Sequence, residues 1–144
     1  MQIEAFTEKW LEECTDLFID TFSRPPWLET YRSREQVLHF LQRFLQNREF
    51  LGFLYRENGR VAALCIGMKK PWLEGVEYYI DQFCVRPDLQ RRGIGSRFLQ
   101  QVEQELRRQG LNGMMLNTER GFPSEAFYRK NGFHALEQAV LFVK

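Results

Sequence analysis

Apolar residues recur along the chain with two different periods, and each period predicts one kind of element. Spacings of three and four residues predict amphipathic helices over residues 7–22, 33–47, 93–109 and 123–130. Alternation and short apolar runs predict strands over residues 2–6, 50–55, 60–67, 76–85, 111–118 and 133–143. The order β-α-α-β-β-β-α-β-α-β predicts an α/β (α+β) domain with a mixed central β-sheet flanked by helices.

Turn and cap residues mark several of these boundaries. Ser33 and Gln36 have the spacing of a capping box at a helix N-terminus. Asn58-Gly59 is a strong hairpin signal between two strands. Gly110 follows a helical stripe as a C-terminal glycine, and Pro123 is placed like a proline in the first turn of a helix. These local signals support the boundaries that the periods predict.

The strand over residues 76–85 changes its phase part-way. Tyr78 and Ile80 share one face by the two-residue period, whereas Phe83 and Val85 belong to the opposite phase. One extra residue near Asp81-Gln82 would shift the later side chains in this way. We therefore predict a β-bulge there. Bulges re-aim side chains beside active sites and leave backbone groups free for a ligand.

Composition excludes several function classes. The 20 Lys and Arg residues and 19 Asp and Glu residues give a formal net charge of +1, without the basic excess that nucleic-acid binding favours. No apolar run reaches the roughly 20 residues that span a bilayer, and residues 1–4 do not resemble a signal peptide. We expect one domain over residues 1–144, located in the cytoplasm, with no nucleic acid and no membrane as partner.

Cysteine and histidine usage argues against a metal site. Cys14, Cys65 and Cys84 are far apart and form no CxxC pair, and the chain has only two histidines. This pattern suits a reducing compartment and predicts neither a disulfide framework nor a bound metal. Cys84 is expected to be structural rather than nucleophilic.

The segment Val85–Ser96 has the layout of an anion-binding loop. It joins an apolar strand to the clearest helix and contains Arg91, Arg92 and two glycines, Gly93 and Gly95. Glycines allow the backbone to approach a ligand closely, and the free N–H groups of a new helix point at negative charge. The loop is expected to bind a pyrophosphate, although a solvated basic turn would have the same composition.

Two motifs resemble the GNAT N-acetyltransferase superfamily. Gln90–Gly95 is similar to its Q/R-x-x-G-x-G/A signature, and Ala126–Phe133 resembles its late helix and "FYxKxGF" turn. Val85-Arg86-Pro87 and the element order over residues 2–143 are also similar. Tyr79–Gln82 resembles a segment of aminoglycoside 6′-N-acetyltransferases in which the aspartate lies by the reacting amine.

The resemblance implies the GNAT acyl-CoA N-acyltransferase fold and acetyl-CoA as cosubstrate, with no metal. Many members have a cofactor-binding Asn at the position of Gly121, and Asn117 or Thr118 is the nearest substitute. The implied cofactor-binding residues are Phe83, Cys84, Val85, Gln90, Arg91, Arg92, Gly93, Ile94, Gly95, Ser96, Asn117 and Tyr128.

Acetyl transfer to an amine needs a base, because a lysine-like amine is almost fully protonated at pH 7. Asp81, at the expected bulge, is the first candidate and Glu77 the second, while substrate-ammonium binding or a structural ion pair are the alternatives for both. Tyr128, at the tyrosine position of the family, is expected to protonate the departing CoA thiolate. The amine would attack directly, without an acyl-enzyme.

The acceptor pocket is expected to involve aromatic and acidic residues. The acidic residues that would suit a cationic amine are Glu29, Glu74, Glu77 and Asp81. We predict an acetyl-CoA-dependent N-acetyltransferase for a small primary amine, such as an aminoglycoside or a polyamine. The sequence leaves open whether the protein is a homodimer. Acetylation of a protein lysine or N-terminus, and a non-catalytic acyl-CoA-binding regulatory module, are the alternatives. The substrate-binding candidates are Trp27, Tyr31, Trp72, Tyr79 and Asp81.

Overall fold

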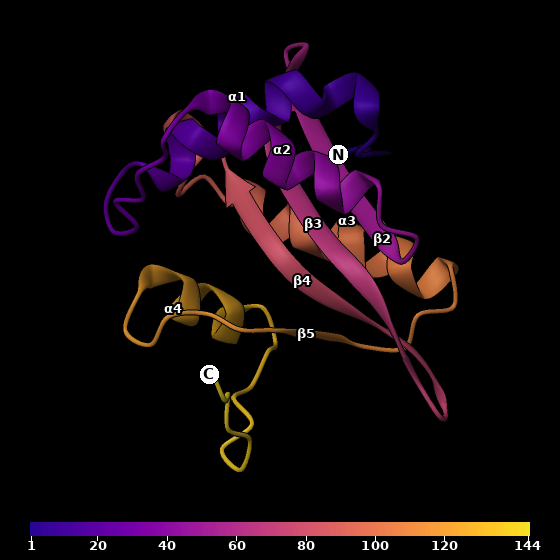
Figure 1. The fold of residues 1–144 in the computed structure, drawn as a ribbon. Helices are drawn as coiled ribbons and strands as arrows, with labels where there is room; N and C mark the ends of the chain where they lie inside the picture. The colour runs from indigo at the N-terminus through magenta and orange to yellow at the C-terminus, as the bar shows by residue number, and fades with distance from the viewer.

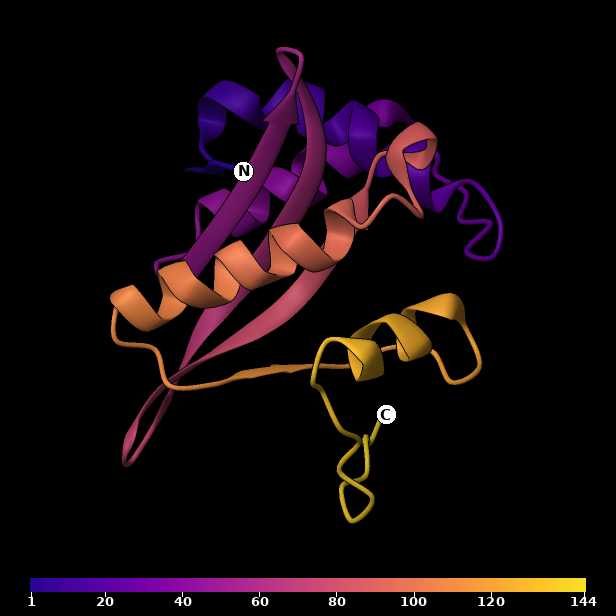
Figure 2. The ribbon, with the colours of Figure 1, turned by 180° about the vertical axis from the view of Figure 1, so that it is seen from behind.

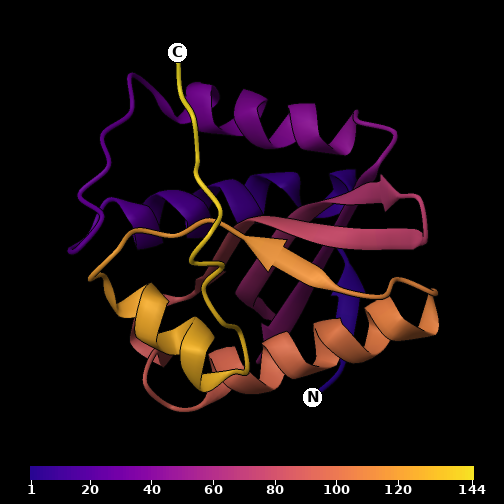
Figure 3. The same cartoon turned by 90° about the horizontal axis from the view of Figure 1, so that it is seen from below.

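A mixed five-stranded sheet with helices on both faces forms the centre of the molecule (Figure 1). The computed structural model describes all residues, 1–144. Helices α1 and α2 cover one face, and α3 and α4 lie on the other (Figure 3). The strands are β1 (Ile3–Ala5), β2 (Phe50–Glu57), β3 (Arg60–Trp72), β4 (Gly75–Val85) and β5 (Met114–Leu116). The helices are α1 (Leu11–Phe22), α2 (Arg34–Leu45), α3 (Ile94–Arg108) and α4 (Pro123–Lys130), with 3-10 turns at Glu8–Trp10 and Pro87–Leu89.

The strands lie in chain order, β1-β2-β3-β4-β5, and every neighbouring pair is antiparallel except β4 and β5. The connection from β4 to β5 runs through α3, which packs on the rear face of the sheet (Figure 2). This mixed sheet flanked by helices confirms the predicted architecture. No helix of the chain is both long and apolar enough to cross a bilayer.

Two hydrophobic cores hold the layers together. The core under α1 and α2 contains Phe18, Leu41, Leu64 and Ile66, all almost fully buried. The core under α3 contains Phe98 and a second set of sheet residues. Burial of each large apolar side chain contributes roughly 1.5–3 kcal/mol, so both helical layers are fixed to the sheet.

The local signals of the sequence form the expected structures, with one shift. The Ser33 hydroxyl accepts a hydrogen bond from the Gln36 N–H at 3.2 Å, while the Gln36 side chain accepts from the Arg32 N–H at 2.7 Å, one residue before the cap. Asn58 and Gly59 have φ values of 51° and 77°. Two consecutive positive φ angles are typical of the type I′ turn that suits a two-residue hairpin.

The predicted strand over residues 133–143 is wrong. These residues form no strand and extend away from the sheet. The sheet ends at β5, whose only strand partner is β4, so the segment has no backbone hydrogen bonds to a neighbouring strand. The predicted strand over residues 111–118 is also shorter, since only Met114–Leu116 pair with β4. The first helix begins later than expected, with a 3-10 turn before Leu11.

Candidate active site

A β-bulge interrupts β4 at Asp81. Ile66 of β3 pairs with Gln82, while the next residue, Gly67, pairs with Ile80, so Asp81 is the extra residue. This confirms the phase break that the sequence predicts. As a result Ile80 and, three positions later, Phe83 both face the core under α3.

Tyr78 fixes the strand just before the bulge. Its ring lies over Gly67, where a Cβ would overlap both the ring and the Tyr79 carbonyl. Its hydroxyl crosses β3 and donates a hydrogen bond of 2.6 Å to the Leu51 carbonyl on β2. The first half of β4 is therefore tied to three strands at once, and the bulge has a rigid base.

Beyond the bulge, β4 loses its second neighbour. Pairing with β5 covers only Tyr78–Ile80 and Met114–Leu116, after which the chain leaves the sheet toward α4 (Figure 1). On this side Asp81–Val85 has no strand partner, while β3 continues on the other side. We call the divergence of residues 81–85 from residues 117–122 the fork. An extended amide-bearing ligand could pair with this strand edge.

The loop that follows β4 presents a series of free backbone donors. The Gln90 amide donates to the Val85 carbonyl at 2.9 Å and holds the loop against the strand end. Arg91 and Gly93 have φ values of 63° and 75°, in the left-handed region. No backbone N–H of residues 91–96 donates a hydrogen bond within the protein. Successive free N–H groups of this kind form a concave site for an anion.

The electrostatics of this loop favour the same ligand. The first turn of α3 contains no acidic residue, and the positive end of the helix dipole lies there. Arg91 and Arg92 are exposed beside it. Ile94 is buried against Ala62 and Leu89, which anchors the start of the helix. The predicted anion-binding residues are thus brought together, and the loop fits a diphosphate.

Gly95 serves packing as well. A Cβ at this position would lie 3.2 Å from the Phe127 ring of α4 and 3.4 Å from a methyl group of Val85. Phe127 in turn stacks on Phe83 of β4 at 5.5 Å between ring centroids. The small side chain of Gly95 therefore allows α4 to approach the loop and the fork.

Tyr128 lies on the inner side of α4. Its ring packs against Phe83 at 6.3 Å and Phe133 at 5.3 Å between centroids. The side chain is half-buried, and its hydroxyl has no hydrogen-bond partner in the protein. Burial raises the pKa of Tyr128 well above its usual value, so this hydroxyl keeps its proton at neutral pH.

Asp81 carries the least satisfied carboxylate of the sheet. One of its oxygens is buried without a hydrogen-bond partner, and no basic residue forms an ion pair with it. Burial raises its pKa above the ordinary value for aspartate. The structural ion pair considered as an alternative role for Asp81 is absent. Its environment favours proton uptake.

Glu77, the second candidate base, lies in the other half of β4. Its side chain lies against Gly113, beside the start of β5, four residues before Asp81. At about 3.3 Å per residue, that separates the two backbones by roughly 13 Å. Tyr79, between them, contacts the side-chain amide of Asn117 through its hydroxyl. This contact closes the base of the fork.

An open pocket of about 280 Å³ lies on the α1–α2 face beside the bulge. Tyr31, a predicted substrate-binding residue, is part of it, and its hydroxyl donates to Glu29 at 2.7 Å. Burial and this hydrogen bond raise the pKa of Tyr31. Sequence reasoning missed Gln82, although the phase break marks its position. The lining is Phe18, Glu29, Tyr31, Gln36, Val37, Phe40 and Gln82.

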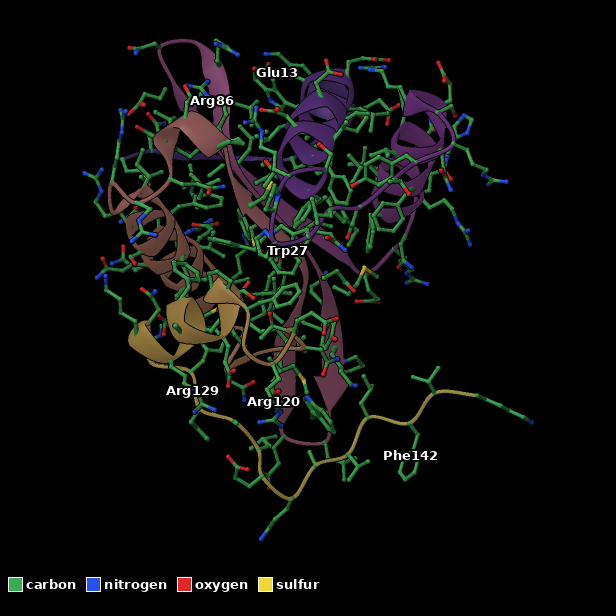
Figure 4. All side chains as sticks on the ribbon, turned by 90° about the vertical axis from the view of Figure 1, so that its left-hand side faces the viewer. Glu13, Trp27, Arg86, Arg120, Arg129 and Phe142 are labelled. Atoms are coloured by element: carbon green, nitrogen blue, oxygen red, sulfur yellow. The ribbon has the colours of Figure 1, made fainter.

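The two tryptophans in the predicted pocket have different positions. Trp27 packs edge-on against Phe122 at 5.1 Å, which joins the α1–α2 segment to the segment before α4 (Figure 4). Trp72 instead lies at the tip of the β3–β4 hairpin, half-exposed, with the Lys70 ammonium over its ring. It is roughly 20 Å along the strand from Asp81. The structure therefore does not bring Trp72 to the site.

Two further predicted positions differ in what they offer. The Cys84 side chain is buried in the core under α1 and α2, so only its backbone faces the fork. Burial raises the pKa of its thiol to about 12.

Gly121, at the family asparagine position, has φ of 80° and donates its N–H to Glu125. Thr118 is engaged with the Ser124 hydroxyl at 2.6 Å. The Asn117 Nδ2 donates to the Tyr79 hydroxyl, so the Asn117 Oδ1 is the side-chain amide atom left for a ligand there.

Comparison with known families identifies the scaffold. A family model described as the acetyltransferase (GNAT) family matches residues 4–133. The chain belongs to the GNAT acetyltransferase family. As a family member it is an acetyl-CoA-dependent N-acetyltransferase, which agrees with the anion-binding loop. No curated protein matches the sequence significantly.

Solved structures of acetyltransferases share the fold over nearly the whole chain. A probable acetyltransferase superposes with a TM-score of 0.82 at 17% identity, covering 100% of this chain and 97% of that one. The aminoglycoside 6′-N-acetyltransferase of Acinetobacter haemolyticus gives 0.76 at 19% identity, covering 100% and 98%. AAC(6')-Iy, in complex with a CoA-containing bisubstrate analogue, gives 0.75 at 16% identity, covering 99% and 97%.

Proposed function

We propose that this GNAT enzyme acetylates a primary amine of a small molecule, with Asp81 as the base. The observation that carries the proposal is the bulge: it places a buried, unpaired carboxylate oxygen where β4 passes from the α1–α2 pocket to the fork. A raised pKa makes a carboxylate a stronger base toward an ammonium group. Asp81 would take the proton from the acceptor amine, directly or through one water.

The cosubstrate would lie along β4 and the loop after it. Acetyl-CoA supplies an activated acetyl thioester. The backbone N–H groups of residues 91–96 would bind its diphosphate, and Arg91 and Arg92 would add charge-assisted contacts. The free edge from Phe83 to Val85 would pair with its amide-bearing arm. Asn117 would supply a further polar contact.

Tyr128 would act as the acid for the leaving thiolate. Its hydroxyl holds a proton at neutral pH and has no protein partner to compete for it. Its ring is fixed between Phe83 and Phe133, so α4 sets its orientation toward the fork. With a base and an acid on opposite walls, the amine can attack directly, and no covalent acyl-enzyme is required.

The pocket beside the bulge favours a small cationic acceptor. Tyr31 provides an aromatic wall, and Glu29 provides a carboxylate within the same pocket. Neighbouring solved structures include aminoglycoside 6′-N-acetyltransferases, which makes an aminoglycoside the first acceptor class to test. Polyamines are cationic amines as well, so they are the second acceptor class to test. A protein lysine acceptor and a non-catalytic acyl-CoA-binding role are the competing outcomes.

Release of CoA thiol across a panel of amines tests the proposal. The panel contains aminoglycosides, polyamines and lysine-containing peptides. We expect turnover with a small polyamine or aminoglycoside and a several-fold higher KM for it in Glu29→Gln. The control is Glu74→Gln, an exposed carboxylate at the β3–β4 hairpin. Turnover with peptides alone would refute the acceptor class, and acetyl-CoA binding without any turnover would refute the enzyme.

A further inference from the structure

Most of the lining of the pocket beside the bulge is apolar. Phe18, Tyr31, Val37 and Phe40 contribute four of its seven residues. Phe18 links the rings, since it lies 5.8 Å from Phe40 and 6.2 Å from Tyr31 between centroids. These distances fall in the range of roughly 4.5–7 Å at which aromatic rings attract one another. A further ring supplied by a ligand would extend the same cluster.

Phe40 leaves apolar surface uncovered in this pocket. It is 38% exposed, whereas Val37 and Leu41 of the same helix are buried. Phe44, one turn later on α2, contacts its ring at 5.2 Å between centroids but does not line the pocket. Removal of apolar surface from water favours binding. A ligand body that covers Phe40 is therefore bound more tightly than one that leaves it exposed.

The same pocket has negative charge for one ammonium group. Glu29 is the only charged residue in its lining, and the Tyr31 hydroxyl already donates a hydrogen bond to Glu29 Oε2. Asp16, on α1, is paired with Arg34 at 2.8 Å. A second ammonium group would therefore enter a largely apolar pocket without a carboxylate partner, and such burial of a charge is costly.

Two other acidic residues expected to suit a cationic amine do not reach the pocket. Glu74 lies in the turn between β3 and β4, and Glu77 lies against Gly113. The pocket volume of about 280 Å³ is also just below the roughly 300–1,000 Å³ of pockets that enclose drug-sized ligands. It suits one ring, so the further rings and ammonium groups of an aminoglycoside would stay in solvent.

We propose that the preferred acceptor is a monoamine in which a short chain joins one primary amine to an apolar ring, as in 2-phenylethylamine. The inference rests on the proposed function, since it names the acceptor class of the same site. The ring would lie against Phe18 and Phe40, and Glu29 would attract the ammonium group. The chain would lead the nitrogen past Gln82 to Asp81, its neighbour on β4.

The reaction of this acceptor balances with the residues already assigned. The nitrogen forms a bond to the acetyl carbon while the bond between that carbon and the CoA sulfur breaks. The ammonium group loses two protons in all. One passes through Asp81 to solvent, and the other replaces the proton that Tyr128 gives to the thiolate. The products are the N-acetyl amine and free CoA thiol.

Steady-state release of CoA thiol with three amines tests the inference. 2-Phenylethylamine, propylamine and 1,4-diaminobutane each present a primary amine on an alkyl chain, and they differ in what the chain carries. We expect all three to be acetylated, with kcat/KM about tenfold higher for 2-phenylethylamine, because only its ring covers Phe40. A kcat/KM for either of the other amines that equals or exceeds it would overturn the inference.

Phe40→Ala shows whether the ring contact is the cause. It should lower the ratio of kcat/KM for 2-phenylethylamine to kcat/KM for propylamine by about fivefold. Comparing this ratio between proteins cancels the different basicities of the two amines. Phe44→Ala is the matched control, because it removes a ring from the same helix outside the pocket and should leave the ratio as it is. An unchanged ratio in Phe40→Ala, or an equal fall in both variants, would overturn the inference.

The outcomes separate this inference from the proposed function. Turnover of small amines without a preference for the ring would overturn the inference alone, and the protein would still be an N-acetyltransferase of small amines. No turnover with these three amines, with aminoglycosides or with longer polyamines would overturn the proposed function, and the inference with it.

Discussion

The two halves of β4 have the same strand backbone but differ in the pairing of their second edge. Before the bulge the strand pairs with β3 from Gly75 to Ile80 and also with β5 at Tyr78–Ile80, and Tyr78 ties it across β3 to β2. From Asp81 to Val85 it keeps only β3, and its other edge faces the fork. A single extra residue separates the two halves. Backbone pairing thus stabilises the first half, and the second half has backbone groups left for a ligand.

The two carboxylates of β4 give the sharpest test of this division. Asp81→Asn should lower kcat/KM for the acceptor amine by about 10²–10⁴-fold, because the amide cannot take a proton. Glu77→Gln, in the paired half of the strand, should change it by no more than about threefold. Steady-state CoA release measures both. If the large loss follows Glu77→Gln instead, the base belongs to the paired half.

Substitution of Tyr128 tests the proposed acid on α4, which lies across the fork from the unpaired half of β4. Tyr128→Phe should lower kcat by about 10²-fold, since the ring packing stays and only the proton donor is lost. Affinity for acetyl-CoA should hardly change. Tyr55→Phe is the control, because this tyrosine is also half-buried on the α3 side but belongs to β2. An unchanged kcat in Tyr128→Phe would remove it as the acid.

The loop after β4 should lose affinity when its left-handed backbone is disturbed. Gly93→Val should weaken acetyl-CoA binding about tenfold, because a β-branched residue at φ of 75° costs roughly 1–2 kcal/mol and relaxes by turning the loop donors away. Gly110→Val is the matched control at the other end of α3, with φ of 85° and equally open space. Calorimetric titration should show normal affinity there. Equal losses in both variants would indicate general destabilisation.

Local sequence signals predicted the parts of the molecule that depend on local physics. The period-two pattern located the bulge at Asp81 because a slip reverses every later side chain, and Asn58-Gly59 located a hairpin because its φ angles demand such residues. Positions that depend on assembly were not predictable. Trp72 has the composition of a pocket residue, but the length of the hairpin carries it away. Gln82 lines the pocket only because α2 closes over it.

Stability against pH should show the smallest difference between the halves of β4. Burial raises the pKa of Asp81 in the folded state, so the folded protein binds its proton more tightly than the unfolded chain does. The favourable contribution is therefore present below the unfolded pKa of about 3.9 and is lost as pH rises through the higher folded value. Asp81→Asn removes this loss, so the variant should gain in melting temperature relative to the natural protein between pH 4 and pH 7. Thermal unfolding followed by circular dichroism measures this gain across the range. A gain for Asp81→Asn that is the same at every pH would mean that packing, rather than the buried charge, causes the difference in melting temperature. The ionised Asp81 carboxylate would then not destabilise the folded protein.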